Sequence, residues 1–451
     1  MDLWTESDNH ELASAPVEQA EKPGRAVGTR FNPSTNAVLL ALRAWLLADY
    51  TAPYCRSLAA TRIFRRCFWI DASGGIRSAA RKITGSQGRA ESRLSIFDDL
   101  AQSGQPAGDA LSSTNAVLRP LVVLAGDLAR ESRPITLQGI VLAGSKGNDK
   151  QNKENTTQTT FVLPKESSMV NADWREVAPE LLPAIEQFAA MFLLNPLAVS
   201  KVSASKNKKS EIPFLTSDEL APLLQRTTPT ELCLLLMHRQ VETILFPALR
   251  TPAGAAAFST LLRNDRWKAL LAQESEPTVD KVIDLLSTAL HPHFPFVQRI
   301  VFPMLIGPAT IENAPCSLLF ATRRQDSLAC MNDAVCGYRR RLEQESHSGT
   351  LSEAWFAAQQ AERTAQAMQQ LREDTLRAGR ARSPRRWPDL RQQMLLARFG
   401  QCTLREYDEL ICNLLQAGEV RCEWRQPGMD GLRVPGNEDI LLWQVKKNWT
   451  R

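Results

Sequence analysis

The chain has 451 residues, of which 43% are hydrophobic and 23% are charged. Its 54 lysines and arginines against 49 aspartates and glutamates give a net charge of +5, which excludes a histone-like tail protein and an acidic solvating protein. A soluble chain of two to four domains is expected, because one domain usually spans roughly 100–200 residues.

The sequence carries no sign of a membrane or secreted protein. No charge-free apolar run is long enough for a transmembrane helix, so no membrane partner is expected. Residues 1–33 are polar and without periodicity, which predicts a disordered leader and no secretory signal. The nine cysteines are scattered and form no CxxC pair, which favours reduced thiols and a cytoplasmic location. A metal site at Cys316, Cys330 and Cys336 would need paired close spacings and a fourth ligand, so no metal is expected.

Hydrophobic periodicity predicts strands that alternate with helices from residue 35 to about residue 341. The strands are expected at 63–70, 135–143, 160–163, 191–194, 231–237 and 316–322. The helices are expected at 35–49, 54–61, 113–129, 175–190, 217–224, 251–271, 278–290 and 326–341, with 241–302 mainly helical. Strands that alternate with helices indicate βαβ units and a mostly parallel sheet.

The C-terminal part has a different pattern. A long helix at 351–378 is expected to end at Gly379, followed by a basic linker at 380–388. Further helices are expected at 390–398, at 404–410 and, as a continuation or a third helix, at 411–416, with strands at 420–424 and 440–443. Helices followed by a β-hairpin are the order of a winged helix, which binds DNA through a recognition helix or serves as a protein-docking module. The candidate recognition helix is acidic, which disfavours major-groove reading.

The strand at 63–70 ends in Asp71 and is followed by small residues as far as Gly75. Doubly wound α/β folds bind nucleotide-like ligands at such junctions, because a turn without bulky side chains lets the ligand approach the backbone. A generic strand-to-turn junction has the same pattern, so both interpretations stay open on these residues alone.

Several further motifs follow this turn in a fixed order. They are Leu194-Asn195-Pro196-Leu197, Ile212-Pro213-Phe214, Leu318-Leu319-Phe320-Ala321-Thr322 and Met331-Asn332-Asp333. The ordered set resembles the three-Cys-motif partner family, a group of bacterial methyltransferase-like proteins, over roughly residues 36 to 440. That family has an Asp-x-Phe-Ala-Gly-x-Gly turn after its first strand, a later Asp-Pro-x-Gly segment and a C-terminal winged helix.

The resemblance implies a Rossmann-like, methyltransferase-type sheet with helical additions and S-adenosylmethionine as the cofactor at the first turn. Asp71, Gly74 and Gly75 would bind the cofactor, and Asn195 and Pro196 would hold the target nitrogen as the catalytic pair. Any reaction would be methyl transfer from the sulfonium to that nitrogen, with the protein mainly orienting the reactants and excluding water.

The chain departs from the family pattern at several of these positions. Ser73 and Gly74 stand in place of Phe-Ala, Arg77 replaces the last glycine of the turn, and Ala198 replaces the glycine of Asp-Pro-x-Gly. The strand at 135–143 ends without the carboxylate that usually holds ribose hydroxyls. These departures predict a degenerate cofactor site.

Positive charge gathers in two segments that are candidates for contacts with nucleic-acid phosphates. They hold Lys206, Lys208, Lys209, Arg380, Arg382, Arg385 and Arg386. The alternative is that solvated loops simply carry charge. His238, directly after the strand at 231–237, is similarly open to two interpretations, a general base or a structural histidine.

The sequence therefore predicts an α/β protein with a leader at 1–33, a Rossmann-like domain at 34–345, a long helix and basic linker at 346–388, and a winged helix at 389–451. The expected function is that of a methyltransferase-like protein that acts on or binds nucleic acid with a protein partner from the same gene cluster, in bacterial phage defence. The alternatives are a catalytically inactive scaffold and a winged-helix regulator that binds protein or DNA.

Overall fold

The computed structural model describes ten segments of the chain. They are residues 35–74, 113–143, 163–164, 166–170, 172–198, 212–272, 278–306, 310–347, 353–425 and 433–443. All of them belong to a unit that spans Ser34–Arg451. The leader predicted at 1–33 lies outside the described residues.

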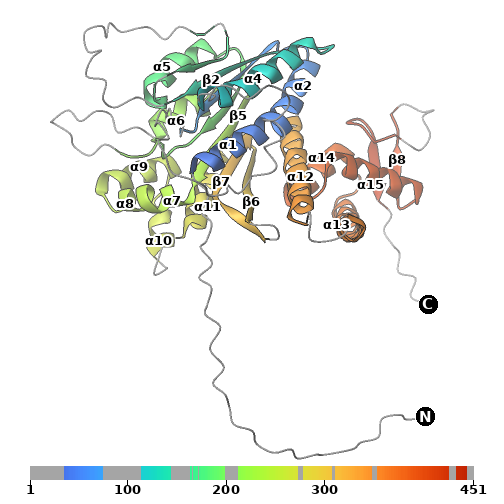
Figure 1. Ribbon diagram of the computed structural model, residues 1–451. Coiled ribbons are helices and arrows are strands. Elements are labelled where there is room, and N and C mark those ends of the chain that lie inside the picture. Colours follow the sequence, from blue (N-terminus) through green and yellow to red (C-terminus); the bar gives the residue numbers. More distant parts are fainter. Residues whose placement is uncertain are drawn as a thin grey trace, which may run out of the picture. The chain divides into compact units, whose positions relative to one another are not determined.

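A seven-stranded sheet lies at the centre of this unit, in the order β3-β2-β1-β4-β5-β7-β6 (Figure 1). Its strands are β1 (Arg66–Ala72), β2 (Thr136–Leu142), β3 (Ser168–Val170), β4 (Ala189–Leu194), β5 (Thr230–Met237), β6 (Phe296–Ile306) and β7 (Thr310–Thr322). The first five pair in parallel, whereas β7 pairs antiparallel with β5 and with β6. The fold is therefore α/β with a mostly parallel, Rossmann-like sheet, which confirms that part of the prediction.

Both faces of the sheet are apolar because helices cover both of them. Along β1, Cys67 and Trp69 face one core, whereas Phe68 and Ile70 face the other. The first face carries α1 (Thr35–Trp45), the π-helix η1 (Leu46–Thr51), α2 (Ala52–Ala60), α4 (Ser113–Arg130) and α12 (Gln325–His347). The second carries α5 (Trp174–Ala184), α6 (Ser217–Leu224), α9 (Pro252–Leu262) and α11 (Val279–Leu290). No helix among the described residues has the length and apolar character needed to cross a membrane.

The chain between β5 and β6 is helical, as predicted, although its boundaries differ. It also contains α7 (His238–Gln240), η2 (Val241–Leu245), α8 (Phe246–Leu249) and α10 (Arg266–Ala272). The single helix expected at 251–271 is two helices, because Arg263 adopts a left-handed conformation with φ of 56° and ends α9.

One of these predictions was wrong at its end, and a strand prediction falls mostly outside the described residues. Residues 241–302 were expected to be mainly helical, but β6 starts at Phe296 and forms an edge of the sheet. Its Pro303 is accommodated because the pairing with β7 shifts register between Val301 and Pro303. Of the short strand expected at 160–163, only Leu163 is described, and it lies outside any strand; residues 160–162 lie outside the described residues, and β3 follows at Ser168–Val170.

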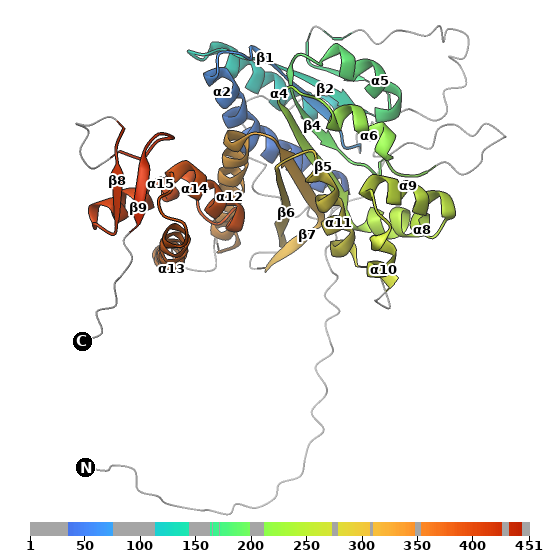
Figure 2. The ribbon, with the colours of Figure 1, turned by 180° about the vertical axis from the view of Figure 1, so that it is seen from behind.

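The described residues of the C-terminal part form helices that are followed by a β-hairpin (Figure 2). They are α13 (Glu353–Ala381), α14 (Trp387–Ala397), α15 (Leu404–Gln416), β8 (Val420–Glu423) and β9 (Ile440–Trp443). The buried side chains of Trp387, Tyr407 and Trp443 belong to the same hydrophobic cluster as Trp69 of β1. The C-terminal helices and the sheet therefore share one core.

Helix α12 joins the two parts through the Asn332-Asp333 pair. Asn332 is fully buried, accepts a hydrogen bond from the Gly400 N–H and donates one to the Cys402 carbonyl, each at 2.8 Å. The Asp333 carboxylate accepts the Leu404 N–H at 2.8 Å, at the first residue of α15. These contacts fix the N-terminus of α15 against α12.

Gly379 does not end the long helix, which continues to Ala381. A Cβ atom at residue 379 would lie 2.2 Å from Cδ2 of Trp443. The glycine is therefore needed because the indole of β9 packs directly on the backbone of α13.

Replacing Gly379 with alanine is expected to lower the free energy of unfolding by about 1–3 kcal/mol, because Trp443 must move off the helix. The matched control is Gly337→Ala in α12, where the nearest atom to the new Cβ is the flexible Arg341 Nη1 at 3.6 Å. This control should gain up to about 1 kcal/mol from helix propensity. Urea unfolding of both variants tests the packing, and a stabilised Gly379→Ala protein would contradict it.

Candidate functional site

The turn after β1 is built around Asp71, whose side chain is completely buried. The guanidinium of Arg43, on α1, donates from Nε to Asp71 Oδ2 at 2.6 Å and from Nη2 to Ser73 Oγ at 2.8 Å. The same Nη2 donates to the Gly74 carbonyl at 2.8 Å. The other carboxylate oxygen of Asp71 accepts the Ser73 hydroxyl at 2.6 Å and the Ser73 N–H at 3.0 Å. Arg43 and Ser73 therefore satisfy both oxygens of this carboxylate.

Gly74 is the last described residue of the turn, and Gly75 and Arg77 lie outside the described residues. Its φ of 75° lies in the left-handed region, which favours glycine. A Cβ at this position would lie 3.0 Å from the Cβ of Ala198. The turn after β1 and the loop after β4 therefore approach each other closely at Gly74.

The Asn195-Pro196 segment follows β4 directly, beside the Asp71 turn. Asn195 is 4% exposed, and its amide donates to Gln240 Oε1 at 2.9 Å and accepts the Leu197 N–H at 2.9 Å. The carbonyl of Pro196 accepts the Leu215 N–H at 2.9 Å. Both polar groups that the resemblance assigns to a target nitrogen thus have partners within the protein.

Gly74 and Asn195 border a crevice at the carboxyl ends of the parallel strands, whereas Asp71 and Pro196 are sequence neighbours of its lining residues. From β1 the sheet is built outward on one side through β2 and β3, and on the other side through β4 and β5. Open α/β sheets bind ligands at the point between two such halves, which here lies between β1 and β4. Gly74, Asn195 and Ala198 line the crevice with Leu142 of β2 and Trp174 of α5. The structure therefore brings together Asp71, Gly74, Asn195 and Pro196, as the sequence predicted.

Sequence reasoning missed Asp173, which also lines the crevice. No carboxylate was found at the end of the strand at 135–143, and β2 indeed ends at Leu142. Asp173 instead follows β3, where its carboxylate accepts the Arg175 N–H and caps α5. The Asp-x-x-Glu pattern from Asp173 to Glu176 signals such a cap, but only the sheet order places it at the crevice.

His238 lies at the end of β5, and its Nε2 is 3.0 Å from the Ser317 hydroxyl of β7. Burial lowers the pKa of its imidazole from the usual 6.5, so the ring is mainly neutral near pH 7. The contact with a neighbouring strand favours the structural interpretation of this histidine.

The candidate phosphate-binding residues fall into two groups. Lys206, Lys208 and Lys209 lie outside the described residues. Arg380 is in the last turn of α13, whereas Arg382, Arg385 and Arg386 lie between α13 and α14, where Arg385 pairs with Leu441 through backbone hydrogen bonds. The side chains of Arg382 and Arg386 are exposed, whereas Arg385 is half-buried and donates to Gln393 at 2.5 Å.

Among the described residues no group of three or more His, Cys, Asp or Glu side chains is arranged to hold a metal ion. No protein-family model, curated protein or solved structure matches this chain. The fold and the crevice define the class, an α/β protein with a Rossmann-like sheet.

Proposed function

We propose that this chain is a methyltransferase-like binding protein of the three-Cys-motif partner type, in which the protein's own side chains close the S-adenosylmethionine site. It acts with a protein partner on nucleic acid, in bacterial defence, and does not itself transfer a methyl group. The observation that carries this proposal is the hydrogen-bonded ion pair of Arg43 with Asp71.

The sheet supports the methyltransferase-like part of the proposal. The order β3-β2-β1-β4-β5 is that of doubly wound nucleotide-binding sheets. One antiparallel strand, β7, is inserted between β5 and β6. This insertion is compatible with the methyltransferase-type sheet that the family resemblance implies.

The crevice supports the non-catalytic part. A cofactor that used Asp71 would have to compete with the guanidinium of Arg43 for a carboxylate that has no exposed surface. The Asn195 side chain is held by Gln240 and by the Leu197 N–H, and the Pro196 carbonyl accepts the Leu215 N–H. The residues assigned to cofactor and target therefore have partners within the protein, which fits a structural role better than a site that exchanges ligands.

The C-terminal part supports a winged helix that docks to protein. The backbone bridge between Arg385 and Leu441 adds a short third strand, giving the order helix, strand, two helices and hairpin. A recognition helix reads bases with its N-terminal residues. Here that end of α15 is held by Asp333 and by Arg340, which donates to both Glu406 oxygens at 2.8 Å.

Nucleic acid would then be contacted through phosphates at the exposed Arg382 and Arg386. Neutralising both residues to glutamine is expected to reduce the slope of log affinity against log salt by about 1 to 2. The control is Arg405→Gln, an exposed arginine already paired with Glu409. The slope is measured by fluorescence anisotropy with a labelled duplex. An unchanged slope in the double variant would mean that the two arginines do not contact phosphates.

A second candidate function, an active methyltransferase, is favoured by one observation. Trp174 lines the crevice, and its indole N–H has no hydrogen-bond partner among the described residues. Together with Asp173 and the backbone near Gly74, it offers polar groups that a bound cofactor would use.

Titration calorimetry with S-adenosylmethionine separates the two candidates. At millimolar cofactor and near neutral pH, we expect no binding heat above dilution, because Asp71 remains paired with Arg43. Saturable binding with one site per chain would contradict the closed crevice and establish the enzyme candidate. Adenosine serves as the control ligand, since it lacks the amino acid group that Asp71 would contact.

A further inference from the structure

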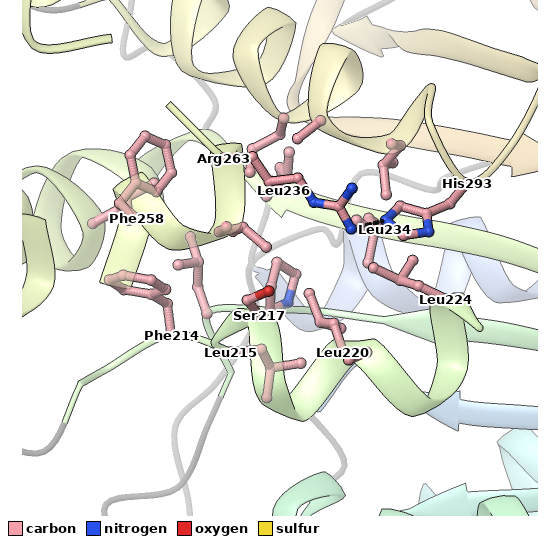
Figure 3. A pocket seen from close by; sticks show the side chains of 18 of the residues that line it. Phe214, Leu215, Ser217, Leu220, Leu224, Leu234, Leu236, Phe258, Arg263 and His293 are labelled. Carbon is pink, nitrogen blue, oxygen red and sulfur yellow. Dashed lines mark hydrogen bonds between the residues drawn. The ribbon is translucent and has the colours of Figure 1, made fainter. Parts of the chain in front are cut away.

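A second, mostly apolar pocket lies between β5 and the helices α6, α9 and α11 (Figure 3). Its enclosed volume is ≈ 60 Å³, within a wider hollow of ≈ 800 Å³ that includes space open to solvent. Leucines dominate the lining, with Phe214 and Phe258 at one end of it. Leu215 borders both this pocket and the crevice, so the two are neighbours.

The other end of the pocket carries polar groups. The guanidinium Nη2 of Arg263 lies 3.0 Å from Nε2 of His293, and Figure 3 shows the two side chains meeting beside Leu234. Arg323 lies behind His293, where its Nε donates to the His293 carbonyl at 2.9 Å. The Nη1 of Arg323 is buried and has no hydrogen-bond partner in the part of the chain that the structure describes.

This end of the pocket is positively charged. Neither Arg263 nor Arg323 forms a salt bridge with a carboxylate of the described residues. The pKa of the His293 imidazole is lowered, first by burial and then by the charges of Arg263 and Arg323. The ring therefore stays neutral near pH 7, so the positive charge at this end comes from the two guanidinium groups, and the buried Glu231 acts electrostatically on Arg323.

The backbone at Arg263 indicates that its side chain has a role. Arg263 ends α9 with φ of 56°, a left-handed conformation that glycine adopts most easily at this position. A non-glycine residue there is strained, and such residues cluster at functional sites. The side chain of Arg263 is exposed and is part of the lining of the apolar pocket.

We propose that this pocket binds a medium-length alkyl carboxylate. The leucine-lined space takes the alkyl chain, and the carboxylate lies against Arg263 and His293, where Arg323 adds positive charge. Ligand sites are usually apolar, with a few polar groups that fix the orientation of the ligand. This site does not depend on the function proposed for the crevice.

Decanoate is the probe for this site, and 1-decanol and decyltrimethylammonium are its neutral and cationic counterparts. In calorimetric titrations of the full chain, decanoate is expected to bind at least tenfold more tightly than decanol, and the cation not at all. Equal affinities for the three probes, or no decanoate binding, would overturn the proposal.

Two substitutions test the residues. Arg263→Gly is expected to weaken decanoate binding at least tenfold while the affinity for decanol changes less than twofold. Its thermal unfolding midpoint should equal or exceed that of the unchanged protein, because glycine relieves the strained backbone. Arg266→Gln, an exposed arginine that does not line the pocket, should leave both affinities unchanged. If Arg266→Gln weakens decanoate binding as much as Arg263→Gly does, the attraction comes from surface charge in general and the site is wrong.

Discussion

Replacing Arg43 with alanine is expected to lower the free energy of unfolding by about 3–5 kcal/mol, because it leaves a buried carboxylate without its counter-charge. Asp71 has no exposed surface, and among the described residues only Ser73 would remain to donate hydrogen bonds to it. Losses of this size are rare for a single substitution. The expected size reflects the cost of an unpaired buried charge more than the strength of the pair itself.

The control for this prediction is Arg56→Ala. Arg56 forms a salt bridge with Glu131, but more than half of its side chain is exposed, so its removal should cost less than about 1 kcal/mol. Adding Asp71→Asn to Arg43→Ala should recover part of the loss, because the neutral amide is less costly to bury unpaired. Urea unfolding of the four proteins measures the difference, and equal losses for Arg43→Ala and Arg56→Ala would contradict the buried pair.

The second large effect is expected at Glu231, near the start of β5. This carboxyl group is fully buried and accepts hydrogen bonds from the hydroxyls of Tyr50 at 3.1 Å and Ser327 at 3.0 Å. Burial raises its pKa from 4.5 to about 7, and the hydroxyl donors offset only part of that cost. The group is therefore protonated in the folded protein at pH values where it is ionised in the unfolded chain.

The sign of the pH dependence follows from this difference. Between pH 4.5 and about 7 the folded state holds a proton that the unfolded state has lost, so stability falls as the pH rises. The total loss over that range is about 3 kcal/mol, because each tenfold difference in proton affinity between the two states corresponds to roughly 1.4 kcal/mol. Above pH 7 both states are ionised, and this contribution is constant.

Glu231→Gln is expected to remove this slope and to be more stable than the unchanged protein at pH 8. The control is Glu409→Gln, which changes an exposed carboxylate that pairs with Arg405. Unfolding free energies measured from pH 4.5 to 8 give the slope for each protein. Identical slopes for Glu231→Gln and the unchanged chain would mean that Glu231 titrates normally.

The sequence predicted the sheet well because its strands are short apolar runs bounded by turn residues. β5 and β9 begin within one residue of the expected positions, and α6 has the predicted bounds. β6 was missed because Arg299 and Pro303 interrupt its apolar pattern. An edge strand with a register shift tolerates these residues, and sequence periodicity does not reveal the shift.

The position of the candidate site could be predicted from the sequence, but the pairing of Asp71 with Arg43 could not. Asp71 and Asn195 each follow an apolar strand, so their meeting at one edge of a parallel sheet was predictable. The partner of Asp71 is Arg43, 28 residues earlier on an amphipathic helix, and no local pattern connects the two. Similarly, the sequence analysis noted the Asn332-Asp333 pair only as part of a family motif. In the structure, this pair forms hydrogen bonds that hold the N-terminus of α15.

The central claim is that Arg43 occupies the place where a cofactor would use Asp71. Crystals of the full chain grown with S-adenosylhomocysteine at millimolar concentration test it most directly. We expect the guanidinium of Arg43 within hydrogen-bond distance of Asp71 and no ligand density in the crevice beside Gly74. Density for the ligand with its amino group on Asp71, and Arg43 displaced, would contradict the account.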